Sequence, residues 1–146
     1  MTRRKALAKV RDLKTLAKDQ LEAEVKQSRQ QVDLAEGRLD SLEDVFRKYA
    51  AEFLQQQKKG PVMARDLDLF YSYFRDLGRK IDDQQRSVQE CRTELEKNQD
   101  AVRKAYTEER LLEILHNKLL RQEEQEAEKC LQKETDSAFL SRRNGK

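Results

Sequence analysis

A single Gly-Pro pair divides this sequence into two long periodic stretches. Gly60 and Pro61 stand together in a chain of 146 residues that has only four glycines and one proline. Proline has no amide hydrogen and its ring clashes with the preceding helical turn, so a helix cannot pass through this pair without a severe break. On both sides, apolar residues recur at alternating steps of three and four, the spacing of one helical face. The sequence therefore predicts two helices joined by a turn at residues 58–63.

Before the break, the apolar stripe covers four heptads and has one polar member, Ser28. This spacing is typical of a coiled-coil seam. The members of the stripe are Val25, Ser28, Val32, Ala35, Leu39, Leu42, Phe46, Tyr49 and Phe53. Towards the N-terminus we expect the seam to continue through Ala6, Val10, Leu13, Ala17 and Leu21. Three successive steps of four between Leu13 and Val25 indicate a stutter, which loosens the supercoil locally.

After the break, a second stripe follows the same spacing. It consists of Phe70, Phe74, Leu77, Ile81, Gln84, Val88, Cys91, Leu95, Asn98, Val102 and Ala105, and then Leu112, Leu115 and Leu119 after a small drift in register. Because so short a connection favours antiparallel neighbours, the predicted fold is all-α: a long antiparallel two-helix coiled-coil hairpin. We expect residues 1–146 to form a single helical hairpin, with helices at about 4–57 and 64–140 and a short C-terminal tail.

The two predicted helices differ in length, so the second should have an overhang. With the turn at Gly60-Pro61, residue 5 should meet a residue near 117, leaving about 20 residues of the second helix without a partner in the chain. A thin apolar stripe continues through this segment at Leu120, Ala127, Leu131 and Ala138. The pattern predicts an overhanging C-terminal helix that contacts another protein.

The composition argues against an enzyme. Charged residues make up 40% of the chain and hydrophobic residues 36%, which is typical of long helices and too little apolar surface for a thick core. The one histidine, His116, has no catalytic partner in view, and there is no Gly-rich phosphate loop or Ser/His/Asp arrangement. We therefore expect no enzymatic activity and no cofactor.

The cysteines and the hydropathy pattern point to a cytoplasmic protein. Cys91 and Cys130 lie far apart in helical patterns and have no neighbouring His or Cys cluster, so neither a disulfide framework nor a metal site is expected. No export signal develops after the basic first residues, and no stretch approaches the roughly 20 apolar residues of a membrane span. Direct membrane insertion is not expected.

Aromatic and basic residues gather at opposite ends of the predicted hairpin. Seven of the nine aromatic residues lie within 15 residues of the Gly-Pro pair: Phe46, Tyr49, Phe53, Phe70, Tyr71, Tyr73 and Phe74. We expect Phe46, Phe53, Phe70 and Phe74 to close the hairpin, and Tyr71 and Tyr73 to project to its flanks as a candidate docking patch. At the other end are Arg3, Arg4, Lys5, Lys9, Arg11, Arg142, Arg143 and Lys146. Nucleic acid is not expected as a partner of this basic end, because no recognition motif is present and four acidic residues lie beside it: Glu123, Glu124, Glu126 and Glu128.

The order of these features resembles the FliJ family of flagellar type III export proteins, whose virulence-system counterparts are the YscO family. The resemblance covers nearly the whole chain. It rests on Ala6-Leu7, Asp12-Leu13, Ala35-Glu36, Leu39, Leu42, Asp44, Tyr49, the run Phe70 to Leu77, Ile81, Gln84-Gln85-Arg86, and Glu128 to Arg143 with Gln132-Lys133-Glu134 and Asp136.

The resemblance implies a stalk that inserts into the hexameric export ATPase, binds the cytoplasmic domain of the export gate and escorts export chaperones. Such a protein is cytoplasmic and peripherally associated with the inner-membrane export apparatus. The residues that match the family's gate-binding surface are Leu42, Tyr49, Tyr73 and Leu77. Val45 stands where the family would have an aromatic residue, and Lys80 and Gln84 also depart from the pattern. The terminal half would enter the ATPase ring, and we infer contacts there from Arg3, Arg4, Lys5, Lys9, Arg11, Leu131 and Phe139.

Alternative functions remain open at this stage. The equivalent stalk of a virulence type III secretion system would have the same features. A gamma-like subunit of a rotary synthase fits less well, because such subunits usually carry a globular domain between their helices. A generic coiled-coil tether is the alternative from a different class.

Overall fold

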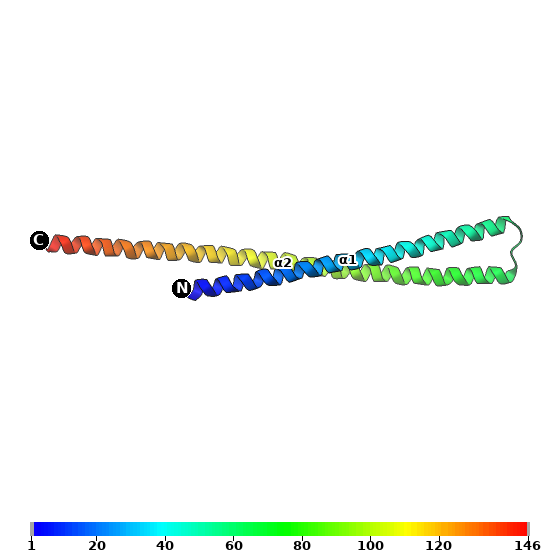
Figure 1. The fold of residues 1–146 in the computed structure, drawn as a ribbon, viewed down its shortest axis with the longest axis horizontal. Coiled ribbons are helices and arrows are strands. Elements are labelled where there is room, and N and C mark those ends of the chain that lie inside the picture. The colour runs from blue at the N-terminus through cyan, green and yellow to red at the C-terminus, as the bar shows by residue number, and fades with distance from the viewer. Residues whose placement is uncertain (1, 146) are drawn as a thin grey trace. The chain divides into compact units, whose positions relative to one another are not determined.

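The structure is a computed structural model that describes residues 2–145. Over that range it contains two α-helices, α1 at Thr2–Lys58 and α2 at Ala64–Asn144, and no strand (Figure 1). The chain divides into two compact units, and each helix contributes to both. The turn unit is residues 21–101, and the terminal unit is Met1–Gln20 with Val102–Lys146.

The connection between the helices depends on Gly60. α1 ends with the amide of Lys59 donating to the carbonyl of Gln56 at 3.2 Å. Gly60 follows with φ at 148°, a conformation that side chains with a Cβ rarely adopt. α2 then begins, with the amide of Leu67 donating to the carbonyl of Met63 at 3.0 Å.

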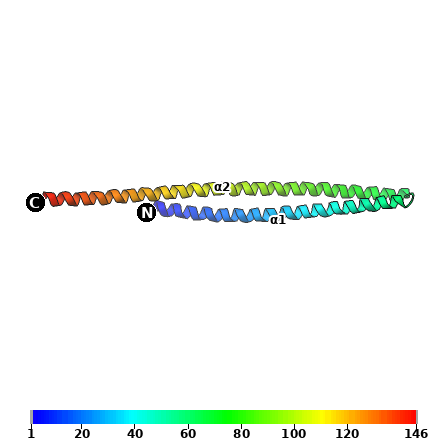
Figure 2. The ribbon, with the colours of Figure 1, turned by 90° about the horizontal axis from the view of Figure 1, so that it is seen from above.

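In the turn unit, α1 and α2 pack side by side in both views (Figure 1, Figure 2). Residue pairs across the interface run in opposite directions along the two helices, since Asn98 meets Ser28 while Phe74 meets Phe46. The buried apolar residues of the described chain all belong to this unit, and all are members of the predicted stripes: Val32, Ala35, Leu77 and Val88. The prediction of an all-α protein with two long helices packed against each other is confirmed, with the antiparallel direction seen here in the turn unit.

The seam of the terminal unit differs from the predicted one. Val10 and Leu13, expected in the seam, are 42% and 65% exposed, while the half-buried positions include Arg11, Thr15 and Lys18. The extension of the α1 stripe into this unit was therefore wrong. The reason is geometric: a step of four residues advances about 40° beyond a full turn, so three such steps carry Leu13 about 120° away from the face that holds Val25.

The α2 stripe also differs from the predicted one in this unit. Leu112 and Leu119 are half-buried as expected, but Leu115 is 50% exposed, and His116 takes the half-buried position beside it. None of the described residues of the terminal unit is fully buried. The half-buried positions of this unit mix apolar residues, such as Leu112 and Leu119, with charged ones, whereas the turn unit has a buried apolar core.

Candidate protein-docking surfaces

Ion pairs join α1 to α2 across the terminal unit. Arg4 lies 3.5 Å from Glu123, and Lys14 lies 3.1 Å from Glu108, with all four side chains well exposed. Exposed pairs of this kind contribute little free energy, because water screens them. They do establish which residues of α1 and α2 face each other within this unit.

A more enclosed ion pair lies deeper in the same interface. Lys18 Nζ is 2.8 Å from Glu109 Oε2, and the two side chains are only 14% and 28% exposed. Glu109 Oε2 is buried and has no hydrogen-bond partner among the described residues. Charge attraction therefore joins it to Lys18. Lys18 also lies over the ring of Tyr106, 4.7 Å from its centroid, a cation–π distance.

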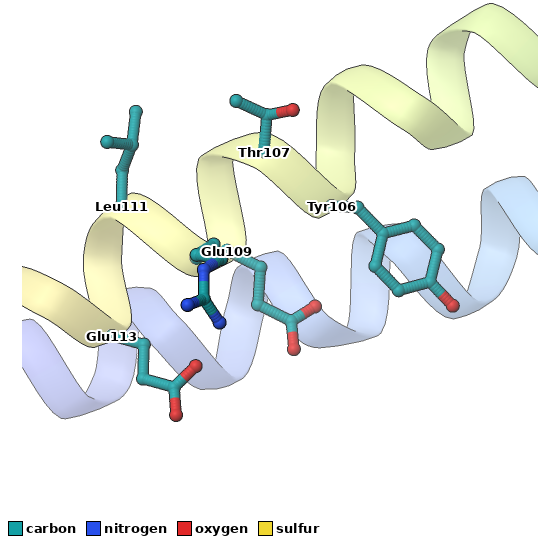
Figure 3. A pocket seen from close by; sticks show the side chains of 6 residues that line it. Tyr106, Thr107, Glu109, Leu111 and Glu113 are labelled. Carbon is teal, nitrogen blue, oxygen red and sulfur yellow. The ribbon is translucent and has the colours of Figure 1, made fainter.

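Tyr106 and Glu109 also line a shallow groove of about 410 Å³ on α2 (Figure 3). This cluster was missed in the sequence analysis. The signal that could have found it is the pair Lys14 and Lys18, one turn apart, matched by Glu108 and Glu109. Recognising it requires the register between two segments about 90 residues apart in sequence, which the stutter obscures.

The predicted ATPase contacts are exposed, with the exception of Arg11. Arg3, Arg4, Lys5 and Lys9 are exposed, whereas Arg11 is half-buried in the seam. At the other end of the chain, Leu131 is 66% exposed and Phe139 is 64% exposed. Of these residues, the structure brings Arg4 to Glu123 on α2.

An aromatic cluster lies in the turn unit beside the connection. Its members, from both helices, are Phe46, Tyr49, Phe53, Phe70, Tyr71, Tyr73 and Phe74, with ring centroids 4.2–6.3 Å apart. Most of the pairs meet edge to face, an arrangement that the charge distribution of aromatic rings favours. The expectation that these residues gather at the turn end is confirmed.

Two tyrosines form the accessible margin of this cluster. Tyr71 is 55% exposed and Tyr73 is 41% exposed, and we call them the aromatic edge. The Tyr73 ring packs edge-on against Tyr49 at 4.2 Å, so its position is held from the other helix. A rigid, partly exposed tyrosine of this kind is well suited to a protein interface, because ordering it on binding costs little conformational entropy.

The Tyr49 phenol is shifted towards its neutral form. Burial raises the pKa of Tyr49 above its ordinary value of 10.0, and Coulombic interactions with Tyr73 and Glu52 raise it further. Tyr49 therefore remains protonated at neutral pH. It can donate a hydrogen bond without carrying charge into the cluster.

The four predicted gate-binding residues have different environments. Leu42 and Tyr49 are half-buried, Tyr73 is exposed, and Leu77 is only 4% exposed. The structure brings Tyr49 and Tyr73 together across the two helices. Leu77 lies in the core of the turn unit, so it can affect a partner only by supporting the side chains around it.

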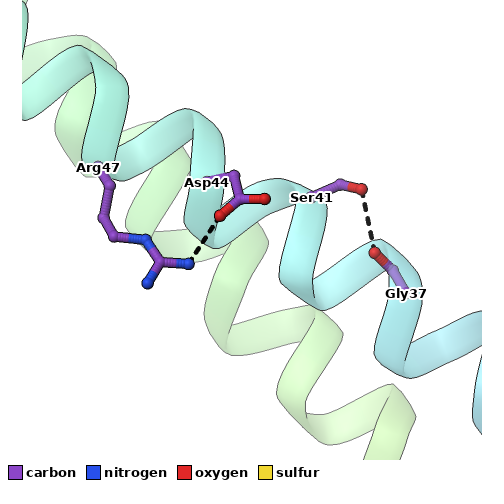
Figure 4. Close-up of polar contacts among 4 residues, drawn as sticks. All are labelled: Gly37, Ser41, Asp44 and Arg47. Atoms are coloured by element: carbon purple, nitrogen blue, oxygen red, sulfur yellow. Dashed lines mark hydrogen bonds and ion pairs between the residues drawn. The ribbon is translucent and has the colours of Figure 1, made fainter.

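Leu42 lines a separate groove of about 570 Å³. Gly37 and Ser41 lie on the same part of α1, and Gln84 of α2 completes the groove. Gln84 donates from Nε2 to the carbonyl of Ala35 at 3.0 Å, which ties the two helices together at this level. Ser41 donates to the carbonyl of Gly37 at 3.0 Å, and a turn further on, Arg47 pairs with Asp44 at 2.7 Å (Figure 4).

The described residues offer no assembled centre for metal chemistry. Within residues 2–145, histidine, cysteine and acidic side chains do not gather in groups of three or more that could hold a metal ion. Cys91 is half-buried and Cys130 is exposed, and both are free thiols. His116 Nδ1 is buried without a hydrogen-bond partner among the residues described. In the same range, neither helix has a segment long and apolar enough to cross a membrane.

A comparison with protein-family models identifies the family of this chain. A family model described as Flagellar FliJ protein matches residues 3–146, essentially the whole chain. The comparisons with curated proteins and with solved structures find no match.

Proposed function

Because this chain belongs to the flagellar FliJ protein family and is thereby a component of flagellar export, we propose that it is a non-enzymatic stalk of the type III export apparatus. In this proposal the chain engages the hexameric export ATPase through one region and the cytoplasmic domain of the export gate through another. It also escorts export chaperones. It acts in the cytoplasm, peripherally associated with the inner-membrane export apparatus.

The observation that carries the gate contact is the meeting of Tyr49 and Tyr73. These two residues match the family's gate-binding surface from different helices, and their rings lie 4.2 Å apart. Tyr73 leaves 41% of its surface exposed beside the even more exposed Tyr71. We assign direct gate contact to the aromatic edge and Leu42, and a supporting role to Leu77.

The proposed ATPase contact uses the terminal unit. Arg3, Arg4, Lys5 and Lys9 provide exposed positive charge that can steer an acidic surface towards α1. On α2, every residue of 124–145 is exposed, beyond the contact between Arg4 and Glu123. We propose that this segment is a C-terminal overhang, and that it presents Leu131 and Phe139 to the ATPase.

The experiment is a pair of assays with crossed controls. Adding the chain to a flagellum-type export ATPase should raise ATP hydrolysis, and Arg3→Glu with Lys5→Glu should reduce that stimulation. Calorimetry with the cytoplasmic gate domain should give weaker binding for Tyr73→Ala, by about tenfold for a residue worth ~1.4 kcal/mol at an interface. Each variant should retain the other activity, which separates loss of one contact from loss of the fold.

Two outcomes would overturn the assignment. Absence of both ATPase binding and stimulation would exclude the stalk role, and unchanged gate affinity in Tyr73→Ala with retained helicity would exclude the aromatic edge. If the chain stimulated only a virulence-type ATPase, it would be the equivalent stalk of a virulence secretion system. If the chain stimulated neither the flagellum-type nor the virulence-type ATPase, the result would favour a generic coiled-coil tether.

A further inference from the structure

Two ion pairs define how α1 and α2 align within the terminal unit. Arg4 lies 3.5 Å from Glu123, and Lys18 lies 2.8 Å from Glu109. The pairs are two heptads apart on both helices and run in opposite directions, so both follow one antiparallel register. Residues seven apart occupy the same face of such a helix. The contact levels between the two ion pairs can therefore be assigned from the half-buried residues.

The level halfway between the ion pairs has no acidic member. Arg11 stands one heptad from both Arg4 and Lys18, and this register places it opposite His116, with both side chains half-buried. His116 Nδ1 is buried without a hydrogen-bond partner among the described residues. A basic side chain therefore faces a histidine here, whereas the two ion-pair levels each join a basic residue to a glutamate.

The two remaining levels differ from each other. At one of them, half-buried Thr15 stands opposite Leu112, and its hydroxyl donates to its own helix, at the carbonyl of Arg11 3.1 Å away. The other level is formed by four half-buried apolar residues: Leu7, Ala8, Leu119 and Leu120. Over the described residues 4–18 of α1, this is the one level that is apolar on both helices.

Such levels hold the N-terminal segment of α1 less firmly than the core holds the turn unit. Four apolar side chains of the turn unit are only 3–7% exposed: Val32, Ala35, Leu77 and Val88. Helices in water gain most of their stability from packing an apolar face, and ion pairs add little once their desolvation is counted. Proteins open locally in cooperative units, and the weakly packed units open first.

We propose that residues 3–20 of α1, which we call the strap, separate from α2 as one cooperative unit while the turn unit stays folded. The strap is the described part of α1 that belongs to the terminal unit, apart from Thr2. Its opening uncovers Leu112, Leu119 and Leu120 on α2 and releases Arg4 from Glu123. The strap thus controls access to this face of α2. The inference is independent of the proposed stalk role, because the opening can be measured on the chain alone.

Native-state hydrogen exchange of the full chain in low concentrations of urea tests the proposal. Amides of residues 6–20 should exchange through one shared opening, with protection at least roughly tenfold lower than that of residues 28–50. Their protection should also fall less with urea, because the opening exposes less surface than unfolding of the turn unit. Protection that rises smoothly along α1 would show fraying alone, and equal protection in both ranges would show a single cooperative unit. Either result would overturn the proposal.

Cysteine labelling measures the same opening from α2. Leu112→Cys with Cys91→Ser and Cys130→Ser places a single thiol beneath the strap. The matched control is Cys130→Ser, which keeps the half-buried Cys91 of the turn unit as its single thiol. The thiol at position 112 should react at least roughly tenfold faster than Cys91. Equal rates, with helicity retained by circular dichroism, would contradict the proposal.

A variant with a more apolar strap should close it. Arg11→Leu with Thr15→Leu places apolar side chains opposite His116 and Leu112, so it should slow labelling at position 112 and raise protection of residues 6–20 by about tenfold. Protection of residues 28–50 should not change. Ala17→Leu with Gln20→Leu is the matched control, because both positions are exposed on the same segment, and it should leave the opening as it is. Equal effects of the two double variants would refute the role of the interface.

Discussion

Asn98 Nδ2 donates a hydrogen bond to Ser28 Oγ at 2.5 Å across the interface of the turn unit, where Ser28 is only 9% exposed. Both residues occupy stripe positions that are otherwise mostly apolar. A polar pair at such positions stabilises one register, because sliding either helix leaves a buried donor or acceptor without a partner. This pair therefore selects how α1 and α2 align.

Ser28→Ala should destabilise the turn unit by about 1 kcal/mol, because Asn98 loses its partner while remaining half-buried. The double change Ser28→Ala with Asn98→Leu should recover most of that loss, since it removes the unsatisfied group and adds apolar contact. Urea unfolding followed by circular dichroism measures both free energies of unfolding. A double variant as unstable as Ser28→Ala would contradict this account of the pair.

Two glycines should respond in opposite directions to alanine. Gly60→Ala should destabilise the chain by about 1 kcal/mol, because Gly60 has φ at 148° and a Cβ strains that conformation. Gly37→Ala should stabilise it by about 0.5–1 kcal/mol, because Gly37 lies within α1 and a Cβ there meets nothing within 4 Å. Thermal unfolding measures the two shifts, and shifts of the same sign would argue against the backbone explanation.

The predictable part of the fold is the part where the apolar spacing is regular. Val32, Ala35, Leu77 and Val88 belong to stripes that alternate three and four without interruption, and these are the residues that the structure buries. Leu13 is separated from Val25 by three steps of four residues. This spacing winds the stripe around the helix, and Leu13 is 65% exposed. Membership of the FliJ family was also predictable from the order of short motifs, and the family match confirms it.

Less of the candidate sites could be predicted. The gathering of aromatic residues was evident from their distance to the Gly-Pro pair. Leu77 matched two patterns, the apolar stripe, which predicts burial, and the gate-binding surface, which predicts contact with a partner, and its 4% exposure agrees with the stripe. The contact of Lys18 with Glu109 was not evident, because it depends on the register between distant segments, which charge patterns alone do not define.

Leu77 and Tyr73 should give contrasting variants although both match the gate-binding pattern. Leu77→Ala should cost about 2–4 kcal/mol of stability, because Leu77 is 4% exposed and truncation opens a cavity. Tyr73→Ala should cost less, because Tyr73 is 41% exposed and its ring packs against the Tyr49 ring at the edge of the cluster. Urea unfolding compares the two. If the order of the losses were reversed, the aromatic edge would be a structural element of the turn unit.

Titration of Tyr49 should make the free energy of unfolding depend on pH in the alkaline range. Its pKa in the folded chain is above 10.0, so the unfolded chain releases the phenolic proton first as pH rises. The contribution of Tyr49 to the free energy of unfolding is therefore fully present below pH 10. It is lost as pH rises from 10 through the pKa of Tyr49 in the folded chain. Tyr49→Phe removes this titration. Its unfolding free energy should therefore fall less steeply between pH 9 and 11 than that of the original chain, and equal slopes would count against the shift.

The ion pair between Lys18 and Glu109 should behave unlike the more exposed pair beside it. Lys18→Met leaves Glu109 Oε2 buried without its counter-charge, and should destabilise the terminal unit by roughly 1–2 kcal/mol, less than for a fully buried pair because Glu109 is 28% exposed. Lys18→Met with Glu109→Leu should be close to neutral or stabilising, because apolar contact replaces two desolvated charges.

Lys14→Met is the matched control, and should change stability by no more than about 0.5 kcal/mol since Lys14 and Glu108 are 48% and 42% exposed. Hydrogen exchange of the amides in residues 102–120 reports these changes within the terminal unit itself. Equal losses for Lys18→Met and Lys14→Met would show that burial does not distinguish the two pairs.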